Sequence, residues 1–161
     1  MKIKITIAAF LFGLLLYSCT KPPEYAIEPE IKFERLTKNN LLQGSGSEDS
    51  TLVTISFTDG DGDLGDRDSL NLFISDGRTG FLENSFRIPF IPEQGASNGI
   101  SGEISFALFT TCCIFDNPSI PPCTVNNNQA TDEVVYRIYI VDRAGNKSNE
   151  VETSPIVLRC D

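Results

Sequence analysis

Residues 132–140 read Asp-Glu-Val-Val-Tyr-Arg-Ile-Tyr-Ile, and this stretch decides the fold class. Within it, Tyr136, Ile138 and Ile140 recur at every second position. A period of two residues places such side chains on one face of the chain, which is typical of a half-buried β-strand. The stretch therefore predicts a strand whose Tyr136, Ile138 and Ile140 side chains line a core.

Similar short runs occur on both sides of this stretch, separated by Gly, Asn, Asp, Ser and Pro. The six further strands that we expect carry Ile31, Phe33 and Leu36; Val53, Ile55 and Phe57; Leu70, Leu72 and Ile74; Phe86, Ile88 and Phe90; Ile104, Phe106 and Leu108; and Ile156 and Leu158. Pro89 and Pro92 place the fourth run at a sheet edge, and residues 110–133 are expected to form a long loop. Seven strands within about 130 residues predict an all-β, antiparallel sandwich.

One local pattern narrows this prediction. The spacing Asp132-x-Val134-x-Tyr136-x-Ile138 resembles the D-x-A-x-Y-x-C run that opens strand F of immunoglobulin domains. The resemblance implies an immunoglobulin-like or fibronectin-III-like sandwich, in which Tyr136 forms a tyrosine corner and Ile138 is buried. Because Ile138 stands where those domains have Cys, the central disulfide between the sheets is not expected. Residues 141–149 also resemble the F–G turn of many bacterial immunoglobulin-like modules.

The N-terminus reads as a targeting segment. Lys2 and Lys4 precede an apolar run over residues 5–17, which is shorter than the roughly 20 residues of a bilayer span. Residues 16–19, Leu-Tyr-Ser-Cys, resemble the bacterial lipoprotein signal. That resemblance implies removal of residues 1–18, acylation of Cys19 and anchoring in the bacterial envelope, with the outer membrane as the expected address. Residues 19–30 then form a lipidated, Pro-rich tether, and residues 31–161 form the sandwich.

Composition excludes several function classes. The 161 residues include no His and no Trp, and the net charge is −9. Without His, the chain has neither Ser-His or Cys-His nucleophile pairs nor imidazole metal ligands. Loss of the signal and its two lysines makes the net charge −11, so nucleic acid is not an expected partner.

A cluster of carboxylates follows the second expected strand. Five Asp side chains lie between residues 59 and 68, interrupted by glycines and one Arg; the candidate ligands are Asp59, Asp61, Asp63, Asp66 and Asp68. Ca²⁺ binds six to eight oxygens in flexible geometry, so a D-x-D-x-D loop suits it, at about 10⁻⁴–10⁻³ M as in extracellular modules. Leu64 and Leu70 stand where an EF-hand needs Gly and Glu, so this is not an EF-hand.

In the sandwich the B–C and F–G loops share one end, which brings Asp142, and with it Asn146, towards the cluster. The alternative is a solvated Asp-Gly turn.

Four cysteines remain if Cys19 is acylated, and they are Cys112, Cys113, Cys123 and Cys160. In an exported domain they predict two disulfides. A bond between the adjacent Cys112 and Cys113 is discounted because its ring would be strained. The alternation of Ile104, Phe106 and Leu108, extended along the chain, turns Cys112 inwards towards Cys160. We therefore expect Cys112–Cys160 and Cys113–Cys123. A redox-active vicinal pair or a thiolate metal site is the alternative.

Several stretches together resemble a family of small uncharacterised lipoproteins from Bacteroidota-type bacteria: SFTDGDGDLG at 56–65, RIPFIP at 87–92, TCC at 111–113 and DRAG at 142–145. The resemblance implies a fold and an address but no activity. We expect a non-catalytic, lipid-anchored binding or structural module that meets an envelope protein partner and holds a weak Ca²⁺ site. The alternatives are a small carboxylate-based hydrolase, and a protease inhibitor that uses a stapled loop at residues 113–123.

Overall fold

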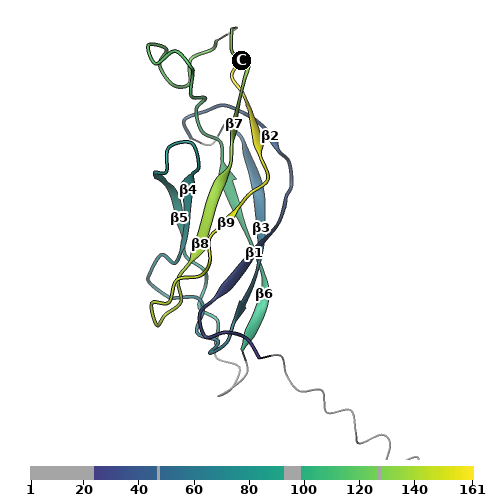
Figure 1. The fold of residues 1–161 in the computed structure, drawn as a ribbon, viewed down its shortest axis with the longest axis vertical. Helices are drawn as coiled ribbons and strands as arrows, with labels where there is room; N and C mark the ends of the chain where they lie inside the picture. Colours follow the sequence, from purple (N-terminus) through teal and green to yellow (C-terminus); the bar gives the residue numbers. More distant parts are fainter. Residues whose placement is uncertain (1–23, 47, 93–98, 127) are drawn as a thin grey trace, which may run out of the picture.

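The computed structural model describes residues 24–46, 48–92, 99–126 and 128–161 (Figure 1). The expected signal, the Cys19 acylation site and the first part of the tether lie outside the described residues. The all-β prediction is confirmed, since the regular elements of the described residues are strands: β1 (Glu30–Leu36), β2 (Asn40–Leu42), β3 (Ser50–Asp59), β4 (Leu72–Asp76), β5 (Leu82–Phe86), β6 (Ile100–Phe109), β7 (Thr131–Val134), β8 (Tyr136–Ile140), β9 (Val151–Glu152) and β10 (Ile156–Arg159). No helix that meets the length and hydropathy of a membrane span occurs in these ranges.

The strands form three hydrogen-bonded sheets. Their strand orders are β1-β3-β6, β2-β10-β7 and β5-β4-β8-β9. Neighbouring strands are antiparallel, except that β2 and β10 run parallel. Only Val135 separates β7 from β8, so one extended stretch leaves the second sheet and enters the third. The long strands run between two poles, which gives a sandwich-like molecule with loops at each end (Figure 1).

One apolar core joins the sheets. The Tyr136, Ile138 and Ile140 side chains of β8 are each at most 1% exposed, as their alternation predicts. They belong to the same buried cluster as side chains from β1, β3, β4, β6 and β10. The burial of alternate side chains explains why these sequences form strands, because the sheets cover one another's apolar faces.

The fourth expected strand is misplaced. We expected Phe86, Ile88 and Phe90 to alternate in it, but β5 covers Leu82–Phe86 and contains only the first of them. Pro89 has no N–H for a ladder, and this segment forms only an isolated bridge between Asp66 and Pro89. Because β5 is an edge strand with no fully buried side chain, its sequence lacks the alternation that marks the central strands.

Three short strands were not predicted. They are β2, β7 and β9, with three, four and two residues. Segments of this length are too short for a period to be recognised, and pairing with longer neighbours forms them. Strand β7 (Thr131–Val134) therefore overlaps the C-terminal end of the segment, residues 110–133, that we expected to be a loop.

The predicted disulfide pairing is wrong. The bonds are Cys112–Cys123 and Cys113–Cys160. The prediction extended the alternation of β6 past its end, but β6 stops at Phe109 and the chain is irregular from Thr110 onwards. As a result Cys113, not Cys112, turns inwards, and both Cys113 and Cys160 are 0% exposed.

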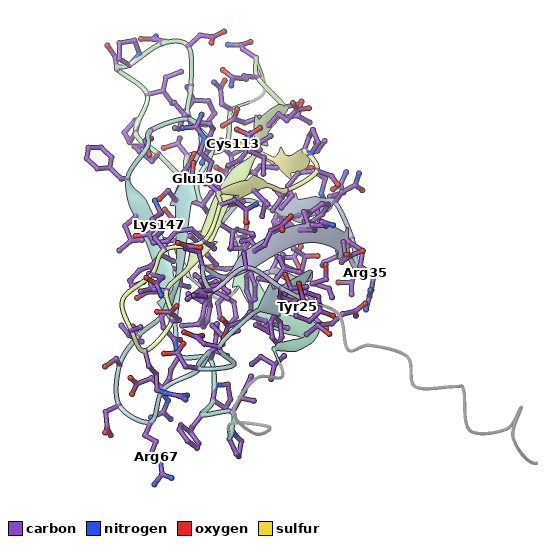
Figure 2. All side chains as sticks on the ribbon, turned by 60° about the horizontal axis from the view of Figure 1, so that its bottom comes forward. Tyr25, Arg35, Arg67, Cys113, Lys147 and Glu150 are labelled. Atoms are coloured by element: carbon purple, nitrogen blue, oxygen red, sulfur yellow. A yellow bond between two sulfur atoms is a disulfide. The ribbon has the colours of Figure 1, made fainter. Side chains whose placement is uncertain are left out.

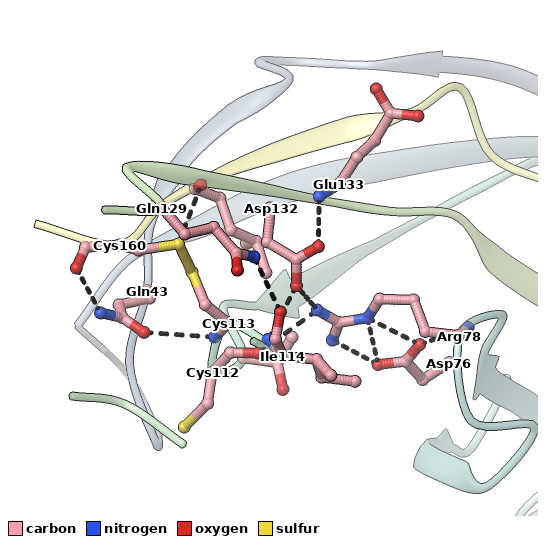
Figure 3. A network of polar contacts seen from close by, with 12 residues as sticks. Gln43, Asp76, Arg78, Cys112, Cys113, Ile114, Gln129, Asp132, Glu133 and Cys160 are labelled. Atoms are coloured by element: carbon pink, nitrogen blue, oxygen red, sulfur yellow. Dashed lines mark hydrogen bonds and ion pairs between the residues drawn. A yellow bond between two sulfur atoms is a disulfide. The ribbon is translucent and has the colours of Figure 1, made fainter. Parts of the chain in front are cut away.

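A polar network secures the chain around these cysteines (Figure 3). The guanidinium of Arg78 is paired with Asp76 at 2.5 Å and with Asp132 at 2.6 Å. Asp132 also accepts a hydrogen bond from the Ile114 N–H at 2.8 Å. Gln43 accepts from the Cys113 N–H at 3.2 Å and donates to the Cys160 carbonyl at 2.8 Å. The stapled loop is therefore joined to the β2-β10-β7 sheet through Asp132 and to the β5-β4-β8-β9 sheet through Arg78 and Asp76, and the Arg78 charge is paired.

Candidate metal centre

Two loops meet at the pole opposite the disulfides. The acidic loop (residues 59–68) follows β3, and a second loop (residues 141–148) follows β8. Asp59, Asp61 and Asp63 from the first loop and Asp142 from the second each present one carboxylate oxygen, and these oxygens lie within 4.8 Å of one another. The predicted approach of Asp142 to the acidic loop is thereby confirmed.

The four carboxylates differ in exposure. Asp59 is 0% and Asp142 6% exposed, Asp63 is half-buried, and Asp61 is open to solvent. The Oδ1 atoms of Asp59 and Asp63 are buried and have no hydrogen-bond partner. A buried carboxylate oxygen without a protein hydrogen-bond partner is unusual in a folded protein, and such an oxygen is available to ligate an ion.

Backbone geometry holds Asp59 in place. Its Oδ2 accepts a hydrogen bond from the Leu64 N–H at 2.9 Å, and the Leu64 side chain is 0% exposed. The chain reverses at Gly62 and Gly65, with φ of 72° and 87°. A Cβ at Gly65 would lie 2.2 Å from the Pro89 carbonyl oxygen, so that position needs glycine for two reasons. The buried leucine thus anchors a tight loop that turns its carboxylates inwards.

The second loop is shaped around Asp142. Asn146 donates from its backbone N–H to Oδ1 at 2.7 Å and from Nδ2 to Oδ2 at 2.8 Å. Asn146, which we expected to offer an oxygen to the cluster, instead orients the Asp142 carboxylate through its amide donors. The Ala144 N–H donates to Asp63 Oδ2 at 3.0 Å, which joins the two loops directly.

Arg143, in the second loop, forms hydrogen bonds to the acidic loop and to the segment near Ile91. Its Nη1 donates to the Gly65 carbonyl at 3.0 Å and contacts the Ile91 carbonyl at 3.5 Å, and its guanidinium lies 4.8 Å from the centroid of the Phe90 ring. Leu64 was named from the sequence only as a departure from the EF-hand pattern, and no role was assigned to Arg143 or Ala144. Among these three residues, Arg143 could have been found from the sequence, because it directly follows Asp142 and a cation is expected beside a carboxylate cluster.

Burial and the crowding of like charges raise the pKa of two carboxyl groups in the site. Burial and the nearby charge of Asp61 raise the pKa of the Asp59 carboxyl to about 7. Burial and the charges of Asp142 and Asp61 also raise the pKa of Asp63, against the opposing effect of Arg143. Both shifts show that a negative charge is disfavoured here unless something positive compensates it.

Two of the candidate ligands lie outside the cluster. Asp66 Oδ1 accepts hydrogen bonds from the N–H groups of Asp68 at 2.8 Å and Ser69 at 3.1 Å, and these bonds lower the Asp66 pKa. Asp66 therefore stabilises a local turn. Asp68 is exposed and does not join the four converging carboxylates. Including these two residues among the ligands was an error of the sequence prediction.

The tether approaches this pole from one side. A Cβ on Gly60 would lie 2.4 Å from the Ala26 carbonyl oxygen and 2.6 Å from that of Tyr25. Figure 2, turned so that this pole comes forward, shows Arg67 at its outer tip and Tyr25 at its side. The absence of a side chain at Gly60 lets the tether backbone lie against the acidic loop.

An all-oxygen cluster of four carboxylates can bind a metal ion, and its chemistry favours a hard cation. No family model, curated protein or solved structure matches this chain. Its function is therefore inferred from the geometry and chemistry of its own residues.

Proposed function

We propose that this protein is a non-catalytic, lipid-anchored module of the bacterial envelope whose loop pole binds Ca²⁺ weakly. The observation that carries the metal proposal is the Asp59 carboxylate, which is 0% exposed and has a buried oxygen without a partner. It faces three further carboxylates that repel it. A divalent cation would satisfy that oxygen and neutralise the repulsion in one step.

Ca²⁺ suits the cluster better than other common metals. Four carboxylates, each monodentate or bidentate, reach the six to eight oxygens that Ca²⁺ takes, with water completing the exposed side at Asp61. Mg²⁺ needs near-octahedral geometry and retains several waters. Zn²⁺ and Cu⁺ favour nitrogen or sulfur ligands, and the cysteines lie at the opposite pole.

The strand order favours an immunoglobulin-like or fibronectin-III-like module. If β1, β3, β4, β6 and β8 correspond to strands A, B, C, E and F, one sheet has the order A-B-E and the other pairs C with F. Immunoglobulin constant domains distribute these strands in the same way. The buried Tyr136 and Ile138 also agree with the pattern that opens strand F.

The lipid anchor rests on the sequence around Cys19. From Cys19 to Tyr25 an extended chain spans at most about 20 Å. Since Tyr25 lies against Gly60, an acylated Cys19 would hold the metal pole near the membrane and direct the stapled loop away from it. A partner in the envelope would then meet the distal half of the domain.

The two alternative functions are less well supported. In an inverting glycosidase the two carboxyl groups stand about 6.5–9.5 Å apart to leave room for a water, whereas here oxygens of all four groups converge within 4.8 Å. An inhibitor loop closed by Cys113 and Cys123 is contradicted, because Cys123 is bonded to Cys112.

The proposal is tested by calorimetry. The full acylated chain in detergent, freed of metal by EDTA, is titrated with CaCl₂ and separately with MgCl₂. We expect saturable heat with Ca²⁺ in the millimolar range or below, weaker heat with Mg²⁺, and none with Asp59→Asn. Asp68→Asn is the matched control, since it removes an equal charge from the same loop but outside the cluster. Absence of saturable heat at 10 mM Ca²⁺, or equal loss in both variants, would refute the metal site.

A further inference from the structure

Two strand edges without a partner lie side by side. Strand β6 ends the β1-β3-β6 sheet, and β5 ends the β5-β4-β8-β9 sheet. Within the described residues, β6 pairs only with β3, and β5 only with β4. Each strand therefore presents one row of backbone N–H and C=O groups that no described strand uses. Such an edge is a template for another extended chain.

The two edges meet at one end and part at the other. The rings of Phe86 and Phe106 touch across them, with centroids 5.4 Å apart. Towards the disulfide pole the space between the edges opens into a groove of about 360 Å³, lined by Glu83, Asn84, Leu108 and Phe109 and by the backbone at Gly46. Both strands thus offer their free edges to one groove.

The groove has a mixed polar and apolar lining, with exposed apolar side chains and carboxylates beside it. Leu108 lies at its base with 1% exposure, while Phe109 and Leu82 remain 42% and 57% exposed. Exposed Glu83 stands on one side. On the other side Glu48 accepts a hydrogen bond from the Gly46 N–H at 2.9 Å, which holds its carboxylate beside the lining.

Two cations from other segments of the described chain are paired with carboxylates other than Glu48 and Glu83. Lys38 is paired with Asp49, and Arg78 is paired with Asp76 and Asp132. Beside the groove lie the free edges of β5 and β6, the exposed Phe109 and Leu82 side chains, and two exposed carboxylates, Glu48 and Glu83.

We propose that this groove binds an extended segment of a partner polypeptide that carries apolar residues at alternate positions and a Lys or Arg at each end. The segment adds a strand to the free edge of β6 or β5, and its backbone hydrogen bonds supply affinity. Its apolar side chains cover the exposed Phe109 or Leu82, and its terminal cations lie opposite Glu83 and Glu48. The groove lining shares no residue with the candidate metal centre, so peptide binding can be tested independently of Ca²⁺ binding.

The test uses synthetic, terminally blocked heptapeptides with the full chain in detergent. The probe is Lys-Val-Thr-Val-Thr-Val-Lys; one comparison peptide has Pro at its centre and another has Glu at both ends. Affinity is measured by fluorescence anisotropy, and the binding site by amide hydrogen exchange. We expect the probe to slow exchange at amides of Leu82–Phe86 or of the Phe109 end of β6. Both comparison peptides should bind at least tenfold more weakly.

Matched variants locate the contact. Phe109→Glu and Glu83→Lys should each weaken binding of the probe at least tenfold. Leu52→Glu replaces a side chain of similar exposure, 48%, on β3 outside the groove lining and should leave binding unchanged. Slowed exchange elsewhere, or an equal effect of Leu52→Glu, would overturn the proposal. So would concentration-dependent dimerisation without peptide that Phe109→Glu abolishes, because the occupant would then be a second copy of the chain.

Discussion

Replacement of Asp59 by Asn gives two effects of opposite sign. Asn keeps the size of the side chain, and its oxygen can still accept the Leu64 N–H. It removes the charge that burial and Asp61 disfavour. Without divalent metal at pH 8, where the Asp59 carboxyl is ionised, we expect the variant to melt at a higher temperature than the wild type.

The response to Ca²⁺ should change in the other direction. At a Kd of about 10⁻⁴ M, 10 mM Ca²⁺ stabilises the wild type by about 2.7 kcal/mol. An unfolding entropy of about 2.1 cal/mol/K per residue, over roughly 140 residues, converts this to a rise in Tm of about 9 °C. Asp59→Asn should abolish the rise, because the site loses its buried anionic ligand.

Differential scanning calorimetry with EDTA and with 10 mM CaCl₂ measures both effects, and Asp68→Asn serves as the control that keeps the full rise. A purely structural role for Asp59 predicts a lower Tm under both conditions. If the variant melts lower in EDTA and keeps the wild-type rise in Ca²⁺, the account of the site given above is wrong.

The remaining predictions concern pH, disulfides and anchoring. In EDTA, Tm should fall as the pH rises from 5 to 7.5. Folding raises the Asp59 pKa from its ordinary value of 3.8 to about 7, so in this range the folded state holds a proton that the unfolded state has lost. Adding Ca²⁺ or replacing Asp59 by Asn should flatten the fall of Tm with pH, and a Tm that rises with pH would contradict the prediction. Peptide mapping without reduction should recover the Cys112–Cys123 and Cys113–Cys160 bonds. Replacing both cysteines of a bond by Ser should lower the free energy of unfolding by about 3 kcal/mol for Cys112–Cys123 and about 4 kcal/mol for Cys113–Cys160, because these bonds close loops with sequence separations of 11 and 47 residues. Chemical denaturation measures both losses and shows which is larger. Cys19→Ser should abolish palmitate labelling and release the protein from membranes, whereas unchanged labelling would reject the anchor.

The sequence by itself determined the all-β class, most of the long strands and the acidic cluster that forms the candidate metal centre. Alternation in β3 and β8 is strong because both bury one face, so the period of two is visible without a structure. The Asp-Gly repeat marked the acidic loop, and the common end of the two loops in a sandwich predicted the approach of Asp142.

The tertiary structure alone decided the features that depend on how irregular segments turn. Periodicity holds only while a strand continues, so beyond Phe109 it predicted the wrong cysteine as buried. Asp63 and Asp66 look equivalent in the sequence. The buried Leu64 and the turn at Gly65 direct Asp63 towards the cluster, while backbone N–H groups hold Asp66 in a local turn. Long-range packing thus selects which carboxylates converge, because spacing along the chain does not specify the direction of a side chain outside regular structure.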